Sequence, residues 1–178
     1  MKNLVNVLLL LLITSSIYSC SSSNYSLGKD RFIISWDSVW GVDHNNYILT
    51  IEEMKRADKI IEDSIEILYL NSGQDPRDRY LDKNALDYYY RQYSSYIYDD
   101  DTIIVVNFLD KKDMDAYIKF RYNDYNHWLK RGKPEEAQGV LDLSKEWITV
   151  CDGGNDYWII CINLTKKRIE SFSKNGYS

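Results

Sequence analysis

The chain has few of the residues from which catalytic and metal-binding sites are built. Its 178 residues include two histidines, three cysteines and two prolines. His44 and His127 lie on separate irregular segments and form no HxxxH or HExxH pattern, the spacings that bind zinc. Glycine-rich nucleotide-binding patterns and a GxSxG nucleophile motif are absent too. We therefore expect no enzymatic activity, no metal and no cofactor, and keep a small hydrolase with a histidine base only as an alternative.

Positive charge and long apolar runs are also scarce. Lysine and arginine number 22 against 27 aspartates and glutamates, which gives a net charge of −5. The cations form no stripe of the kind that binds phosphates, so we expect neither nucleic acid nor anionic lipid headgroups as main partners. Aspartate clusters at residues 99–101 and 110–115 lack the glycine and distal glutamate of an EF-hand loop. After residue 20, no apolar run reaches the roughly 18 residues that span a bilayer.

The first twenty residues have the layout of a secretory signal. Lys2 precedes an apolar run over residues 4–13, and small residues then lead to Cys20. The tetrapeptide that ends at Cys20, IYSC, resembles the lipobox of bacterial lipoproteins. This resemblance implies that Cys20 is lipidated and becomes the first residue of the mature protein. The alternative is an ordinary secretory signal that is cut near Cys20.

We expect three regions: a lipoprotein signal peptide at 1–19, a flexible polar tether at 20–30 and a single domain at 31–178. The abundance of tyrosine, asparagine, lysine and isoleucine resembles that of Bacteroidota envelope proteins. Both resemblances imply a lipid-anchored protein of the cell envelope, held at the outer membrane and facing the periplasm or the cell surface. A lipid is then the expected membrane attachment.

Residues 50–68 show the clearest secondary-structure pattern. Thr50 and Glu53 have the spacing of a capping box. One face of the predicted helix carries Ile51, Met54, Asp58, Ile61, Ile65 and Leu68. Because charged residues occupy the other face, the pattern predicts an amphipathic helix that ends near residues 71–73. We expect Ile61 and Ile65 to pack on a sheet, and Glu62 to face solvent.

Most of the other patterned segments are typical of β-strands. They cover residues 91–98, 102–109, 146–151, 157–164 and 168–172, with shorter apolar stretches at 32–34 and 47–49. Gly153-Gly154 predicts a tight hairpin between the third and fourth of these strands. The expected fold is α+β: one long amphipathic helix on a curved antiparallel sheet of four to five strands. This arrangement resembles the cystatin-like and NTF2-like folds.

The region between residues 110 and 143 shows no clear periodicity. It is polar and aromatic, with a helical turn predicted at 114–118 and a loop at 132–134. We expect it to cover one face of the predicted Gly-Gly hairpin. In that hairpin Cys161 lies opposite Glu146 and on the other face from Cys151, so we expect both cysteines to stay reduced.

Tyrosine is abundant, with sixteen residues in the chain. A surface for a glycan or a peptide could use Tyr88, Tyr90, Tyr93, Tyr96 and Tyr98. Strand alternation, however, places Tyr96 and Tyr98 on one face and Tyr93 on the other. We therefore favour the simpler interpretation that these tyrosines cover the sheet under the helix.

Three triplets, at residues 37–39, 63–65 and 101–103, resemble the Asp-(Ser/Thr)-aliphatic O-glycosylation site of Bacteroidota. Ser38 and Thr102 lie near predicted loops, where a bulky sugar fits. Ser64 lies in the middle of the predicted helix and fits less well. The resemblance therefore implies Ser38 and Thr102 as glycosylation sites.

The sequence as a whole predicts a lipid-anchored envelope protein with a non-enzymatic binding or structural role. The expected partners are the membrane, through the lipid, and an envelope protein or glycan. The alternative is a carbohydrate- or peptide-binding module that uses the tyrosine-rich strand.

Overall fold

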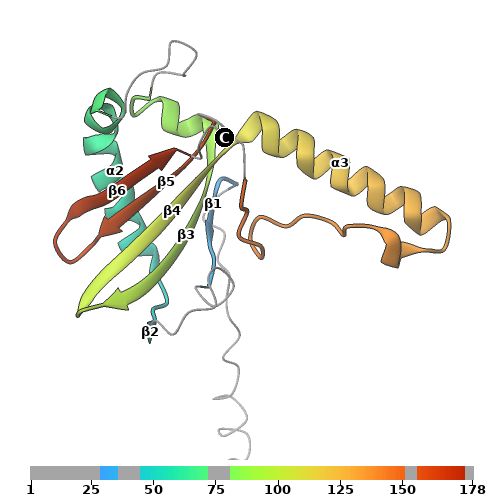
Figure 1. Ribbon diagram of the computed structural model, residues 1–178, viewed down its shortest axis with the longest axis horizontal. Coiled ribbons are helices and arrows are strands. Elements are labelled where there is room, and N and C mark those ends of the chain that lie inside the picture. Colours follow the sequence, from blue (N-terminus) through green and yellow to red (C-terminus); the bar gives the residue numbers. More distant parts are fainter. Residues whose placement is uncertain (1–28, 36–44, 72–80, 151–155, 175–178) are drawn as a thin grey trace, which may run out of the picture.

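The computed structural model describes residues 29–35, 45–71, 81–150 and 156–174. They form an α+β fold in which a mixed sheet carries one helix on a face and a second helix at one end (Figure 1). In chain order the elements are β1 (Arg31–Ile33), β2 (Asn45–Asn46), α2 (Ile51–Asn71), η2 (Ala85–Tyr88), β3 (Tyr89–Tyr98), β4 (Asp101–Asp110), α3 (Lys111–Lys130), η3 (Pro134–Glu136), β5 (Tyr157–Asn163) and β6 (Arg168–Lys174). No helix in these described ranges is long and apolar enough to cross a membrane.

The centre of the sheet is the hairpin of β3 and β4, each ten residues long. Asp99 and Asp100 join them with φ angles of 47° and 65°, the left-handed conformation that a two-residue hairpin turn requires and aspartate tolerates. The strand order is β1-β3-β4-β5-β6, and the short β2 also pairs with β3. Because β1 runs parallel to β3, the expectation of a wholly antiparallel sheet is wrong at this edge.

The hairpin predicted at Gly153-Gly154 is not formed. Residues 147–150 form no strand, and β5 pairs with β4 along one edge and with β6 along the other. No edge of β5 is therefore left for residues 146–151. The two strands predicted at 157–164 and 168–172 are confirmed as β5 and β6, and they are joined by a turn in which Lys167 has a φ angle of 54°. Gly153 and Gly154 lie outside the described residues.

Cys161 lies in β5 opposite Val105 and Ser171, and not opposite Glu146 as the predicted hairpin required. Its thiol is free, as expected, and half-buried. Burial raises the pKa of this thiol, which keeps it in the protonated form. Cys151 lies outside the described residues.

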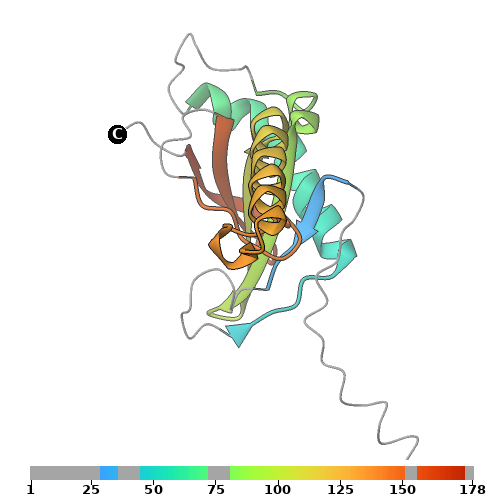
Figure 2. The ribbon, with the colours of Figure 1, turned by 90° about the vertical axis from the view of Figure 1, so that its right-hand side faces the viewer.

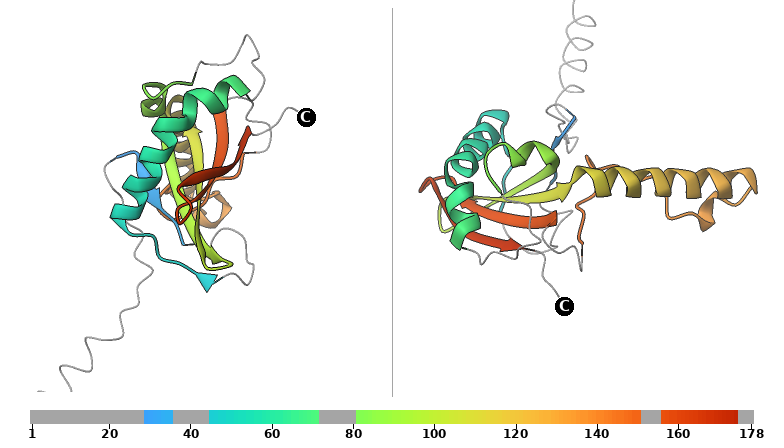
Figure 3. Two further views of the ribbon diagram at one scale, coloured as in Figure 1. Left: turned by 90° about the vertical axis from the view of Figure 1, so that its left-hand side faces the viewer. Right: turned by 90° about the horizontal axis from the view of Figure 1, so that it is seen from above.

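The predicted amphipathic helix is confirmed as α2, which lies over one face of the sheet (Figure 3). The capping box is formed: the Thr50 amide donates to Glu53 Oε2 at 3.0 Å, and the Glu53 amide donates to Thr50 Oγ1 at 3.3 Å. Ile61 and Ile65 are 0% and 1% exposed, as predicted for the face toward the sheet. They belong to the main core, whose sheet residues include Tyr93, Ile104, Val106, Phe108, Trp158 and Ile160.

The other face of the sheet holds an irregular segment, residues 141–150. Gln92 Nε2 donates to the carbonyls of Leu143 and Glu146 at 2.9 and 2.6 Å, and Gln92 Oε1 accepts from the Ile148 amide at 2.9 Å. Asn107 Nδ2 donates to the Ile148 carbonyl at 2.8 Å. Because these two buried amides satisfy the backbone of the segment, its apolar residues can cover the sheet without forming a strand.

The expectation of one long helix missed a second one. Residues 111–130 form α3, where only a turn at 114–118 was predicted. Asp110, the last residue of β4, caps the helix by accepting from the amides of Lys112 and Asp113 at 2.8 and 3.3 Å. Since strand and capped helix join without a loop, α3 begins at the end of the sheet and runs away from it (Figures 1 and 3).

Candidate interaction surface

We name α3 together with the residues that return along it, 131–143, the α3 arm. Figure 1 shows α3 leaving the end of β4 and extending beyond the sheet. Figure 2 looks along the helix, with the return segment beside it. The α3 arm is therefore the part of the described chain that projects farthest from the sheet.

The root of the α3 arm is fixed to the sheet. Met114 is buried in a second core cluster on this side of the sheet. The Tyr90 hydroxyl donates to Asp115 at 2.6 Å, and Lys111 Nζ lies 2.7 Å from Asp30. Burial and the hydrogen bond to Asp115 raise the pKa of Tyr90 to about 12. These contacts hold the first turns of α3 in one direction.

Arg121 joins α3 to the return segment. Its Nε donates to the Gly139 carbonyl at 3.0 Å, its Nη2 donates to the Gln138 carbonyl, and its Nη1 donates to the Tyr117 hydroxyl at 3.1 Å. Gly132 lies where the chain reverses, and Gly139 lies where the return segment meets Arg121. Their φ angles are 69° and 82°, values that residues other than glycine rarely adopt. The return segment therefore covers one side of α3 and leaves the rest to solvent.

Several large apolar side chains of α3 remain exposed. Within α3, Met114 is the buried residue. The exposed ones are Tyr117 at 40%, Phe120 at 59%, Tyr122 at 54% and Leu129 at 48% of their surface. By helical spacing Tyr117 and Phe120 share one side of α3, and Tyr122 and Leu129 share another.

The tip of the α3 arm combines this apolar character with charged residues. Lys130, Arg131 and Lys133 are all exposed. The Arg131 guanidinium lies 5.6 Å from the centre of the Trp128 ring. Cations near the end of a helix complement its dipole and do not by themselves mark a site. Glu135 and Glu136 are also exposed in the adjacent η3, so the tip carries charges of both signs next to the exposed Leu129.

Tyr93, one of the predicted surface tyrosines, is in the core. Strand alternation places it on the α2 side, where it is 0% exposed. Its hydroxyl donates to Asp58 Oδ1 at 2.6 Å, and burial raises its pKa far above the ordinary value. Tyr93 therefore stabilises the domain and cannot contact a ligand at the surface.

The other four predicted tyrosines share no common surface with Tyr93. Tyr90, Tyr96 and Tyr98 project to the opposite face of β3, as alternation predicted for Tyr96 and Tyr98. Tyr88 ends η2, before the strand. Tyr88 and Tyr98 are more than half exposed, but they lie at opposite ends of a ten-residue strand. A glycan or peptide platform here stays a prediction.

Only some of the remaining predicted site residues lie within the described ranges. Cys20, Ser38 and His44 lie outside the described residues. Thr102 is half-buried at the start of β4, where its amide donates to Thr165 Oγ1 at 2.9 Å. His127 is exposed in the last turn of α3, edge-on to the Trp128 ring. Within the described ranges, no three histidine, cysteine or acidic side chains are grouped as metal ligands.

Comparisons of the chain with protein-family models, curated proteins and solved structures found no match. Sequence reasoning missed the exposed residues of α3, namely Tyr117, Phe120, Tyr122 and Leu129. Asp110 as a cap, followed by apolar residues at the helical spacing of Met114, Ile118 and Tyr125, was the signal that could have found them.

Proposed function

We propose that this chain is a lipid-anchored protein of the cell envelope that binds another envelope protein through the α3 arm and catalyses no reaction. The lipobox-like tetrapeptide at Cys20 supports the anchoring. The α3 arm supports the binding. The cystatin-like or NTF2-like arrangement stays a prediction, and the proposal does not depend on it.

The exposure of Phe120 and its apolar neighbours carries the proposal. Full burial of a phenylalanine or leucine side chain stabilises a protein by about 1.5–3 kcal/mol. Phe120 and Leu129 are 59% and 48% exposed, so in the isolated chain they contribute only part of that stabilisation. A partner that covers them gains the rest, because α3 is already ordered by Asp110, Arg121 and the buried Met114.

The chemistry of the arm indicates the kind of partner. Tyr117 and Phe120 lie on one side of α3, and Tyr122 and Leu129, seven residues apart, lie on another. A partner that covers all four therefore contacts the arm on more than one side. The tip carries the cations Lys130, Arg131 and Lys133 together with the exposed Glu135 and Glu136, so its charge does not select a partner of one sign. We therefore expect an envelope protein whose apolar surface contacts more than one side of the arm.

Site-specific photo-crosslinking in intact cells tests this function. A photoreactive phenylalanine analogue at position 120 should give a discrete adduct with a second protein. The same analogue at Asp100, in the turn at the far end of β4, is the matched control and should not give this adduct. Combining the probe with Tyr122→Ser and Leu129→Ser should weaken the adduct.

Two results would contradict the proposal. Identical adducts from positions 120 and 100 would show that the α3 arm is not selective. An adduct with the mass of two copies would show that the arm pairs with itself and not with another envelope protein.

A further inference from the structure

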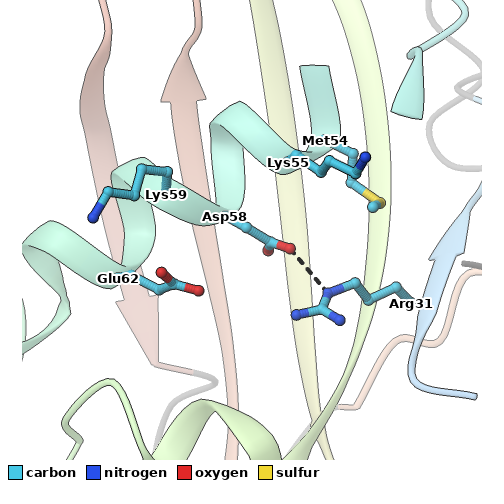
Figure 4. A pocket seen from close by; sticks show the side chains of 6 residues that line it. All are labelled: Arg31, Met54, Lys55, Asp58, Lys59 and Glu62. Carbon is cyan, nitrogen blue, oxygen red and sulfur yellow. Dashed lines mark ion pairs between the residues drawn. The ribbon is translucent and has the colours of Figure 1, made fainter. Parts of the chain in front are cut away.

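A cavity of about 340 Å³ lies between α2 and β1, away from the α3 arm (Figure 4). Its lining residues are Arg31, Met54, Lys55, Asp58, Lys59 and Glu62. All but Arg31 come from consecutive turns of α2, and Arg31 reaches the cavity from β1. The volume is at the lower end of the range found for small-molecule sites.

Three side chains from the sheet surround the Asp58 carboxylate at the base of the cavity, two as hydrogen-bond donors and Arg31 as an ion-pair partner. Arg91 Nη1 lies 2.8 Å from Oδ1, the Tyr93 hydroxyl lies 2.6 Å from Oδ1, and Arg31 Nε lies 2.9 Å from Oδ2. The Arg91 side chain is 4% exposed and that of Asp58 is 11% exposed. This buried network holds Asp58 in place, and through it Arg31.

The negative charge of Asp58 is already neutralised without Arg31. Arg91 already supplies one full positive charge to the carboxylate, and Tyr93 supplies a further hydrogen bond. Arg31 engages Asp58 through Nε, while its side chain is 34% exposed. Its two Nη groups therefore remain available at the cavity, in the planar arrangement that binds a carboxylate with two hydrogen bonds.

Glu62 supplies the opposite charge. Figure 4 shows its carboxylate turned toward the guanidinium of Arg31 across the cavity. Among the described residues no ion pair joins these two side chains. The nearby lysines have other carboxylates, since Lys55 Nζ lies 3.2 Å from Glu52 and Lys59 Nζ lies 2.6 Å from Asp63. The cavity thus presents a separated positive and negative group.

We propose that this cavity binds a free α-amino acid with an apolar side chain. The ligand carboxylate binds Arg31, the ligand ammonium group binds Glu62, and the apolar side chain lies along the methylene stems of Lys55 and Lys59, which also line the cavity. A simple anion would be repelled by Glu62 and a simple cation by Arg31, whereas a zwitterion satisfies both. The site is independent of the α3 arm.

Calorimetric titration of the full chain in detergent tests this site with three related probes. L-Leucine carries both charges, N-acetyl-L-leucine lacks the ammonium group, and L-leucinamide lacks the carboxylate. We expect L-leucine to bind about tenfold or more tightly than either derivative, because each derivative leaves one charged side chain without its partner.

Variants locate the binding. Arg31→Gln and Glu62→Gln should each weaken L-leucine binding by about tenfold or more. Lys130→Gln and Glu136→Gln remove one positive and one negative charge at exposed positions of the α3 arm and should bind L-leucine like the original chain. Glu62 is exposed, so its variant remains informative if the Arg31 variant fails to fold.

Three results would overturn the proposal. The first is an absence of L-leucine binding at millimolar concentration. The second is equal binding of L-leucine and one of the two derivatives. The third is undiminished L-leucine binding by folded Glu62→Gln.

Discussion

Asp58 interrupts the apolar face of α2 and forms ion pairs with the buried Arg91 and the partly exposed Arg31. Asp58→Asn keeps the shape of the side chain but leaves Arg91 buried without a counter-charge. Breaking a buried pair in this way costs about 3–5 kcal/mol, so we expect a loss of that size in the free energy of unfolding, measured with urea. Asp63→Asn removes the exposed pair with Lys59 and should stay within about 0.5 kcal/mol. Similar losses in both variants would contradict the role assigned to Asp58.

Glu53 predicts a dependence of stability on pH. Burial raises its pKa, but hydrogen bonds from Tyr47 and Thr50 outweigh burial and lower the pKa below 4.5. A carboxyl group with a lowered pKa stabilises the fold above pH 4.5, and this contribution is lost as the pH falls through the lowered value. Glu53→Gln should therefore cost about 1 kcal/mol at neutral pH, and less as the pH falls below 4.5. Urea unfolding at several pH values measures this, and a difference independent of pH would contradict it.

Some of these residue roles could be predicted from the sequence and others could not. The positions of Thr50 and Glu53 were sufficient for the capping box, because both partners lie within one turn. Helical spacing also placed Asp58 on the buried face of α2. Its partners could not be inferred, since Arg91 lies 33 residues away and reaches Asp58 only when β3 pairs in the sheet.

At the scale of elements, α2 depends on its apolar stripe. Ile61→Ala and Ile65→Ala should each lower the free energy of unfolding by about 2–5 kcal/mol, because both side chains are buried against the sheet. Glu62→Ala is the matched control on the same helix and should change stability by no more than about 0.5 kcal/mol. Urea denaturation measures all three, and equal losses would mean that the helix packs on a different face.

Two elements show why pattern alone misled the prediction. Residues 147–150 include Ile148 and Val150 at strand spacing, but the buried amides of Gln92 and Asn107 hold them as an irregular cover. In α3 polar and apolar residues do not separate into two faces, so the sequence shows no clear helical periodicity. The side covered by the return segment includes Arg121, and apolar residues also occupy the exposed side. The first error comes from contacts between distant segments, which local periodicity does not encode, whereas the Asp110 cap and the spacing of Met114, Ile118 and Tyr125 were local signals for α3.

At the scale of the whole molecule, the proposed anchor lies in the N-terminal sequence and the proposed contact lies on the α3 arm. Cys20→Ser should abolish labelling with a lipid precursor and move the protein out of the membrane fraction, because no thiol remains at that position for a lipid. Ser21→Ala is the neighbouring control and should leave labelling intact. Undiminished labelling of Cys20→Ser would rule out the lipobox assignment.

The most direct test of the central claim is the size of the protein in gently solubilised membranes. Native electrophoresis should show the original chain in a complex larger than one copy. Phe120→Ser combined with Leu129→Ser should shift it to the size of the free chain, while Asn123→Ser, an exposed polar position of α3, should leave the complex intact. A complex of unchanged size in the double variant, with the fold retained, would contradict the proposal that the α3 arm binds an envelope protein.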